Sequence, residues 1–344
     1  MHSGGLGEGD APQGQPRCPW FSVVVPVWNR SDCVRRALDS VFAQDFQDYE
    51  VIAVDDASDD DSVAVMQSCR DPRLRIIRHP ENRGVCASRG TGTLAAKGEW
   101  IGYLDSDWVL EAGALGHLAS MTERAPNDVG IIGGLVRFDS GAMTSAVLPP
   151  EGPFGFVEYL HWIDTGGAGD YLACFHRRMF QQYAWPTDRR LESGFMLQVS
   201  VEGRRWIDRT VLAVEFTQSA NRLTVDIAPG WRERRLAMAP ALAQDAEDMI
   251  ARFGADLRTH SPHWYQDLLE SAALRHFLSG HRWKGLRFAC RAWCRRPGRV
   301  HLIGVSIVGL LGPRFLVACR QVRWVHAIFL QLIRRRDHRG DGRT

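Results

Sequence analysis

The stretch Glu99-Trp100-Ile101-Gly102-Tyr103-Leu104-Asp105-Ser106-Asp107-Trp108 decides the fold of this chain. Trp100 to Leu104 are apolar and mostly bulky, which is typical of a strand buried on both faces of a parallel sheet. Two carboxylates, Asp105 and Asp107, follow directly. Because ligands of open α/β sheets bind outside the carboxyl ends of the strands, we expect both carboxylates at a binding edge. The alternative is a plain turn, since Asp and Ser favour turns for local reasons.

Other strands and helices alternate around this stretch. Apolar or β-branched runs of strand length predict five more strands, at residues 21–25, 50–54, 74–78, 129–138 and 205–215. Helical periodicity predicts helices over residues 31–44, from about 62 to 69, and over 85–96. This alternation is typical of βαβ units, so the predicted fold class is α/β with a doubly wound, mostly parallel sheet.

The overall composition is that of a folded protein without a disulfide framework. Of the 344 residues, 45% are hydrophobic and 24% are charged. The eight cysteines have no C-x-x-C spacing, which argues against a zinc site and favours a reducing compartment. Residues 1–17 are polar and rich in Gly and Pro, so we expect a disordered lead-in and no signal peptide. The expected location is therefore cytoplasmic.

The charge is distributed unevenly along the chain. Ala272 to Thr344 contain 16 Lys and Arg against 2 Asp and Glu, a net charge of +14, so the remainder carries 2 − 14 = −12. Helical periodicity begins near Gly230, and the apolar run 300–311 is too short to span a bilayer, which takes about 20 residues. We expect a basic helical region on an anionic membrane surface. A solvated helical cap is the alternative, and no nucleic-acid-binding motif is present.

Two further strand ends carry side chains suited to a nucleotide. Trp28, after the first strand, offers an aromatic face for a base, and Asp56 offers an acceptor for a base N–H. Arg89 is a candidate contact for a phosphate. The G-x-x-x-x-G-K-[ST] and G-x-G-x-x-G loops are both absent, so a different phosphate site is needed. Asp105 and Asp107 could hold a divalent cation that neutralises a diphosphate.

Four motifs together resemble a known family. In order, they are Val23-Val-Val-Pro-Val-Trp-Asn29, Val54-Asp-Asp-Ala-Ser-Asp59, Asn82-Arg-Gly-Val-Cys-Ala-Ser-Arg89 and Gly98-Glu-Trp-Ile-Gly-Tyr-Leu-Asp-Ser-Asp107. Over about residues 20–125 the chain resembles the nucleotide-binding half of the family 2 glycosyltransferases, which have the GT-A fold. It departs from the family at three positions, where Trp28, Gly90 and Trp108 stand in place of the common Tyr, Asn and Asp.

The resemblance implies a donor, a cofactor and a set of site residues. It implies inverting transfer from a nucleoside-diphosphate sugar, most simply a UDP-sugar, to an acceptor hydroxyl, with Mn or Mg on the D-x-D. By position, it implies that the nucleotide is bound by Pro26, Trp28, Asn29, Asp56, Arg89 and Asp105, and the metal by Asp105 and Asp107. The implied partners are the nucleotide-sugar donor and a glycan or lipid-linked acceptor, in cell-surface polysaccharide or glycolipid assembly.

Inverting transfer also needs a base for the acceptor hydroxyl. The family places a carboxylate pair near the start of a helix in the second half of the domain, and here that pair reads Glu192-Ser193. Glu192 is the first candidate for the base and Asp188 the second. Glu192 could instead only support the first helical turn. If neither residue is the base, the protein is a degenerate nucleotide-sugar-binding or scaffold protein of the same fold.

We therefore predict three regions. Residues 1–18 form the N-terminal segment, and residues 19–225 form the GT-A domain, with a nucleotide half at 20–125 and an acceptor half at 126–225. Residues 226–344 form a basic helical extension. A peripheral position on the inner face of the cell membrane follows if that extension binds lipid, and no nucleic acid partner is expected.

Overall fold

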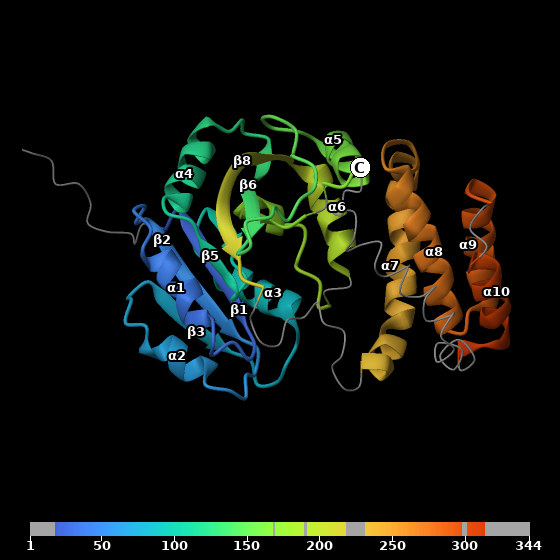
Figure 1. Cartoon of the computed structure of the whole chain (residues 1–344), viewed down its shortest axis with the longest axis horizontal. Helices are drawn as coiled ribbons and strands as arrows, with labels where there is room; N and C mark the ends of the chain where they lie inside the picture. Colours follow the sequence, from blue (N-terminus) through green and yellow to red (C-terminus); the bar gives the residue numbers. More distant parts are fainter. Residues whose placement is uncertain (1–17, 168, 189–190, 218–230, 298–300, 314–344) are drawn as a thin grey trace, which may run out of the picture.

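An eight-stranded mixed sheet forms the centre of the molecule (Figure 1), with strand order β3-β2-β1-β4-β7-β6-β8-β5. The structure is a computed structural model, and it describes residues 18–167, 169–188, 191–217, 231–297 and 301–313. It confirms the predicted α/β class and the mostly parallel sheet, because four of its seven strand pairings are parallel.

The first half of the sheet is entirely parallel, as predicted. Its strands are β1 (Phe21–Val27), β2 (Tyr49–Asp55), β3 (Leu74–Arg78) and β4 (Trp100–Tyr103). The connecting helices are α1 (Val34–Phe42), α2 (Ser62–Ser68) and α3 (Val85–Ala95). All residues of β1, β2 and β4 are buried, in agreement with the apolar runs that predicted them.

The second half contains antiparallel pairings that the sequence did not indicate. The predicted strands are present as β6 (Val129–Phe138) and β8 (Arg204–Glu215). The elements not predicted are β5 (Trp108–Leu110), α4 (Ala114–Arg124), α5 (Phe156–Asp164), β7 (Tyr171–His176) and the 3₁₀ turn Arg177–Phe180. Helix α6 spans Glu192–Glu202. Trp108, which departs from the family pattern, begins β5 and pairs with Glu215 of β8.

Helices cover both faces of the sheet. Val23 and Val25 of β1 pack in one cluster with α1, α2 and α4, whereas Val24 belongs to a second cluster with α3, α5 and α6. The alternation follows from the two-residue period of a strand. The second cluster continues into the C-terminal helices, because Phe156 of α5 lies 5.8 Å, ring centre to ring centre, from Phe253.

Four helices form a layer at one end of the molecule (Figure 1). They are α7 (Trp231–His260), α8 (Pro262–Leu278), α9 (Arg282–Arg295) and α10 (His301–Leu311). Helix α7 begins at Trp231, in agreement with the helical periodicity that begins near Gly230. Among the helices that the structure describes, none has the length and apolarity needed to cross a bilayer. The predicted domain boundary near residue 225 and the basic segment after 313 lie outside the described residues.

Candidate active site at the carboxyl ends of the parallel strands

The predicted binding edge exists because β1, β2 and β4 are parallel neighbours. Val27, the last residue of β1, is paired with Asp55, the last residue of β2. Val24 of β1 is paired with Tyr103, the last residue of β4. The segments that follow these strands therefore leave the sheet on the same side, where open α/β sheets bind ligands.

The segment after β1 combines one exposed aromatic ring with a structural turn. Trp28 is 36% exposed, so its ring is accessible for stacking, whereas Pro26 is buried within β1. Asn29 has a positive φ of 52°, and its backbone N–H donates to Ser58 Oγ at 3.0 Å. Its side-chain oxygen accepts from the backbone N–H of Asp59 at 3.0 Å. Asn29 thus connects the loops after β1 and β2, which holds the Trp28 backbone in place.

Asp56 lies at the edge but is only 2% exposed. Its carboxylate accepts hydrogen bonds from the backbone N–H groups of Arg83, at 2.9 Å, and Gly84, at 2.7 Å. His79 Nδ1 lies 2.7 Å from the same carboxylate. Asp56 therefore fixes the turn that leads into α3, in which Gly84 has φ of 89°. Its contact with a nucleotide base stays a prediction.

The two carboxylates of the D-x-D each face an arginine. Asp105, with its side chain one-third exposed, accepts from Arg89 Nη2 at 2.9 Å. Asp107 is less exposed, and its Oδ2 lies 3.9 Å from Arg30 Nη2. Each D-x-D carboxylate therefore has the positive charge of an arginine beside it.

Arg89 joins the two halves of the domain. Besides Asp105, its guanidinium donates from Nη1 to Glu192 Oε1 at 2.8 Å. Burial alone would lower the pKa of Arg89, but the charges of Asp105 and Glu192 outweigh that effect and raise the pKa above its usual value. Arg89 therefore stays charged. The sequence indicated both carboxylates and the arginine separately, whereas their contact is a result of the fold.

Sequence reasoning missed the group that positions Arg89. The guanidinium carbon lies 5.2 Å from the ring centre of Trp185, whose indole N–H donates to Tyr103 Oη at 2.7 Å. Tyr103 Oη is also 2.6 Å from Thr93 Oγ1 on α3. Trp185, Tyr103 and Thr93, which we call the arginine support, connect the end of β4 with the segment before α6. The only signal in the sequence was an aromatic residue at each of those places.

The candidate bases lie on either side of a short gap in the described residues. Glu192 is the first residue of α6, and its side chain is partly exposed. Asp188 lies before the gap, and its carbonyl accepts from the N–H of Leu191 at 3.0 Å. Glu192 accepts a hydrogen bond from Arg89. The structure thus brings the first candidate to the D-x-D and places the second in the turn that starts α6.

The D-x-D has the donor chemistry for a hard divalent cation but not a complete ligand set. Within the described ranges, no three His, Cys, Asp or Glu side chains come close enough to hold a metal by themselves. Mg²⁺ is commonly held by one or two carboxylates together with substrate phosphates. Asp105 and Asp107 are partly exposed oxygen donors of this kind. They fit a cation that arrives with a diphosphate.

The family comparison agrees with this geometry. Residues 22–181 match the family described as "Glycosyl transferase family 2". This range contains both D-x-D carboxylates, Arg89 and all of β1 except Phe21. Glu192, Asp188 and the arginine support residue Trp185 lie beyond it.

Several curated bacterial proteins are similar to part of this chain. One is the succinoglycan biosynthesis protein ExoO of Rhizobium meliloti, 41% identical over 26% of this chain and 26% of the relative. A second is the uncharacterized glycosyltransferase EpsJ of Bacillus subtilis, 32% identical over 48% and 46%. A third is the GalNAc(5)-diNAcBac-PP-undecaprenol beta-1,3-glucosyltransferase of Campylobacter jejuni, 36% identical over 29% and 33%. The matches span about a quarter to a half of these relatives.

Solved structures support the fold over a longer range. The chain is similar to S. aureus TarS 1-349 in complex with UDP-GlcNAc, with a TM-score of 0.57 and 15% identity, over 88% of this chain and 91% of that one. It is also similar to S. aureus TarS 1-349, with a TM-score of 0.53 and 18% identity, over 84% and 80%. At such identity the likeness concerns the fold.

Proposed function

Because residues 22–181 match glycosyl transferase family 2, we propose that this chain is an inverting, metal-dependent transferase that moves a sugar from a UDP-sugar to an acceptor hydroxyl. Donor, metal and acceptor are parts of the proposal. Its site comprises the accessible ring of Trp28, the D-x-D carboxylates and Glu192.

The observation that carries this proposal is the contact of one guanidinium with both halves of the domain. Arg89 bonds Asp105 on the donor side and Glu192 on the acceptor side, at 2.9 and 2.8 Å. A base for the acceptor hydroxyl must lie close to the sugar that the donor carries. Glu192 and Asp105 bond the same Arg89 side chain, so Glu192 lies close to the D-x-D. The proposed reaction requires a base in this neighbourhood.

The proposed reaction then has a defined role for each group. Glu192 takes the proton of the acceptor hydroxyl while the hydroxyl oxygen forms a bond to the anomeric carbon. The bond from that carbon to the diphosphate oxygen breaks, and its electron pair leaves with UDP. Arg89 places positive charge beside the leaving diphosphate and orients Glu192. A divalent cation held by Asp105 and Asp107 would supply further charge neutralisation.

The acceptor and the location are further parts of the proposal. The names of the similar proteins from R. meliloti and C. jejuni concern succinoglycan biosynthesis and an undecaprenol-linked glycan. We propose for this chain a glycan or lipid-linked acceptor in cell-surface polysaccharide or glycolipid assembly. A peripheral position on an anionic membrane surface is consistent with the excess of Arg in the C-terminal region.

One observation favours the second candidate, a nucleotide-sugar-binding protein without turnover. Ser193 stands where a carboxylate is expected, and the Glu192 that remains is ion-paired with Arg89. Glu192 Oε1 accepts a hydrogen bond from Arg89 Nη1 at 2.8 Å, so this oxygen already has a partner in the structure. If Glu192 serves only as the partner of Arg89 and takes no proton, the protein binds a nucleotide sugar without turnover.

The test is calorimetric binding of a panel of UDP-sugars, with and without manganese, to the wild type and to Asp107→Ala. The proposal expects binding that depends on manganese and that Asp107→Ala weakens, followed by release of UDP when an acceptor is added. Binding that needs no metal and is unaffected by Asp107→Ala would contradict the metal site. Binding without any turnover, with acceptor extracts present, would favour the second candidate.

A further inference from the structure

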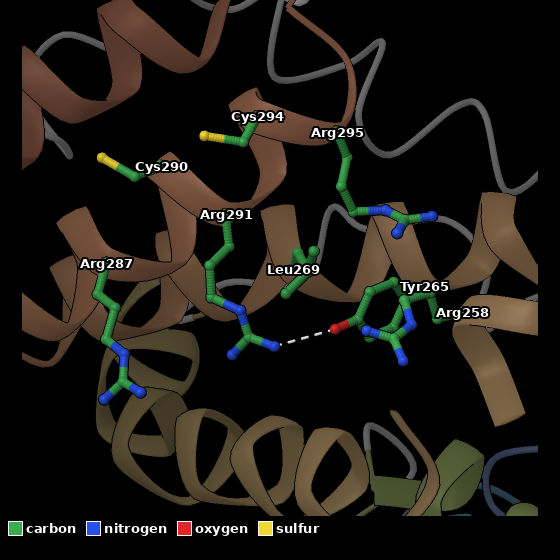
Figure 2. A pocket seen from close by; sticks show the side chains of 8 residues that line it. All are labelled: Arg258, Tyr265, Leu269, Arg287, Cys290, Arg291, Cys294 and Arg295. Carbon is green, nitrogen blue, oxygen red and sulfur yellow. Dashed lines mark hydrogen bonds between the residues drawn. The ribbon is translucent and has the colours of Figure 1, made fainter. Parts of the chain in front are cut away.

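A second pocket lies away from the parallel strand ends, among the C-terminal helices. Its volume is about 480 Å³, and side chains of α7, α8 and α9 line it (Figure 2). The lining residues are Arg258, Tyr265, Leu269, Arg287, Cys290, Arg291, Cys294 and Arg295. Half of them are arginines and none is acidic, so the pocket is strongly positive.

Among the described residues, these arginines have no carboxylate partner. In the part of the chain that the structure describes, no ion pair joins Arg258, Arg287, Arg291 or Arg295 to an Asp or Glu. Four guanidinium groups around one cavity repel one another, which costs free energy unless an anion binds. The positive field of the cluster attracts an anion to this face of the molecule.

Tyr265 lines the pocket and contacts two of its arginines. It is 95% buried, and its hydroxyl accepts from Arg291 Nη2 at 2.9 Å. The guanidinium carbon of Arg295 lies 5.0 Å from the centre of the Tyr265 ring. One buried aromatic side chain thus orients two guanidinium groups. Guanidinium forks bind phosphate with two parallel hydrogen bonds, which selects this ligand over a simple halide.

The pocket continues along one face of α9. Arg287, Arg291 and Arg295 recur every four residues, and Figure 2 shows Arg287 and Arg291 projecting from α9 in the same direction. Like charges at this spacing destabilise an isolated helix. Trp283 stands one turn before Arg287 on the same face and is 80% exposed. An exposed Trp beside a basic stripe is typical of a helix that lies at a membrane interface.

We propose that this arginine pocket binds the phosphate of an anionic lipid headgroup, with Trp283 at the membrane interface. The inference rests on the membrane position proposed above and names the site responsible for it. It does not depend on transfer chemistry, because no pocket residue belongs to the Arg89 site. The exposed Trp283 favours a lipid as the ligand of this pocket. A free phosphate and a nucleic acid are the two alternative ligands that the experiment must distinguish.

The experiment is flotation of the full chain with vesicles of phosphatidylcholine, with and without phosphatidylglycerol. The wild type is expected to bind only the anionic vesicles. The double variant Arg287→Gln/Arg291→Gln should bind them roughly thirtyfold more weakly, since each arginine at the surface contributes about 1 kcal/mol. The matched control is Arg35→Gln/Arg70→Gln, which removes the same charge from α1 and the loop after α2 and should bind as the wild type does.

A second measurement reports on the pocket itself. Cys290 and Cys294 line it and are exposed, and Cys18 is an exposed thiol elsewhere. Anionic vesicles should slow alkylation of Cys290 and Cys294 but not of Cys18, as measured by peptide mass spectrometry. Equal protection by inorganic phosphate alone, or by a DNA fragment without vesicle binding, would overturn the lipid assignment. So would equal vesicle binding by both double variants. UDP-sugar binding of each variant shows separately that the catalytic domain is folded.

Discussion

Glu192, the first residue of α6, accepts a hydrogen bond from Arg89 of α3 at 2.8 Å, although 103 positions separate the two residues in sequence. The same guanidinium contacts Asp105. A candidate base and a candidate metal ligand are therefore held by one cation whose side chain is 15% exposed. The electrostatics of the site depend on that cation remaining in place.

Glu192→Gln tests the base. Glutamine keeps the shape and can still accept a bond from Arg89, but it cannot take a proton, so turnover should fall by about 10²- to 10⁴-fold while UDP-sugar affinity is kept. Initial rates of UDP release and calorimetric affinity measure the two effects. Asp188→Asn is the matched comparison, and the assignment fails if Asp188→Asn abolishes turnover while Glu192→Gln does not.

Arg89→Lys tests the bridge. Lysine retains the charge but lacks the planar guanidinium, whose two separate nitrogens reach Glu192 and Asp105 at the same time. The loss of one charge-assisted hydrogen bond predicts a fall of about ten- to a hundredfold in kcat/KM. Arg70→Lys, at an exposed arginine, should leave kcat/KM unchanged. A wild-type kcat/KM for Arg89→Lys would mean that the bridge has no part in turnover.

Trp185→Phe tests the arginine support. The substitution removes the hydrogen bond to Tyr103 and weakens the interaction of the ring with Arg89, so the free energy of unfolding should fall by about 1–2 kcal/mol. Urea titrations of Trp185→Phe, Tyr103→Phe and the double variant measure the coupling between the two side chains. Additive losses would show that the 2.7 Å hydrogen bond contributes nothing to stability.

Asp245→Asn tests a carboxyl that costs stability at neutral pH. Burial, opposed by the charge of Arg275 and aided by that of Asp248, raises the pKa of Asp245 from 3.8 to about 6. Among the described residues, its Oδ2 has no hydrogen-bond partner. Because the folded-state pKa exceeds the unfolded value, protonation stabilises the fold below pH 4, and this stabilisation is lost as the pH rises through 6. Asp245→Asn should therefore stabilise the protein above pH 6, by about 1 kcal/mol after allowing for solvent screening.

Urea unfolding at pH 8 and pH 4 measures this effect. The gain from Asp245→Asn over the wild type should be present at pH 8 and nearly absent at pH 4. Asp256→Asn, at an exposed position of the same helix, controls for the change in net charge. A gain of equal size at both pH values would show that ionisation of Asp245 is not the cause.

Asp164→Ala tests the junction between the sheet domain and the C-terminal helices. Asp164, at the end of α5, accepts from the N–H groups of His263 and Trp264 at 2.9 and 3.1 Å, at the start of α8. Removing this cap should cost about 2 kcal/mol, which a lower Tm of the full chain would reveal. Burial alone would raise the pKa of Asp164, but the bond from His263 and the others lower it, so its contribution is lost as the pH falls below the ordinary range of a carboxyl. Asp128→Ala, at an exposed site, should leave the Tm unchanged.

The sequence by itself determined the fold class, the parallel strands and the edge where the candidate site lies. Hydrophobic periodicity is a local property, so strands such as Phe21–Val27 and Val129–Phe138 can be identified without knowing their neighbours. Asp105 and Asp107 were also predictable, because residues that follow a buried strand must leave the sheet at its carboxyl edge.

Only the tertiary structure decided which groups meet. Antiparallel β7 lies between β4 and β6 in the sheet. Its place was not predictable from local sequence patterns, because strand order depends on long-range packing. The Arg89–Glu192 contact, the cap that Asp164 provides to α8, and the pocket around Tyr265 all join segments from different elements. Such contacts follow from the burial of shared apolar faces, which places polar side chains together only after the helices have packed.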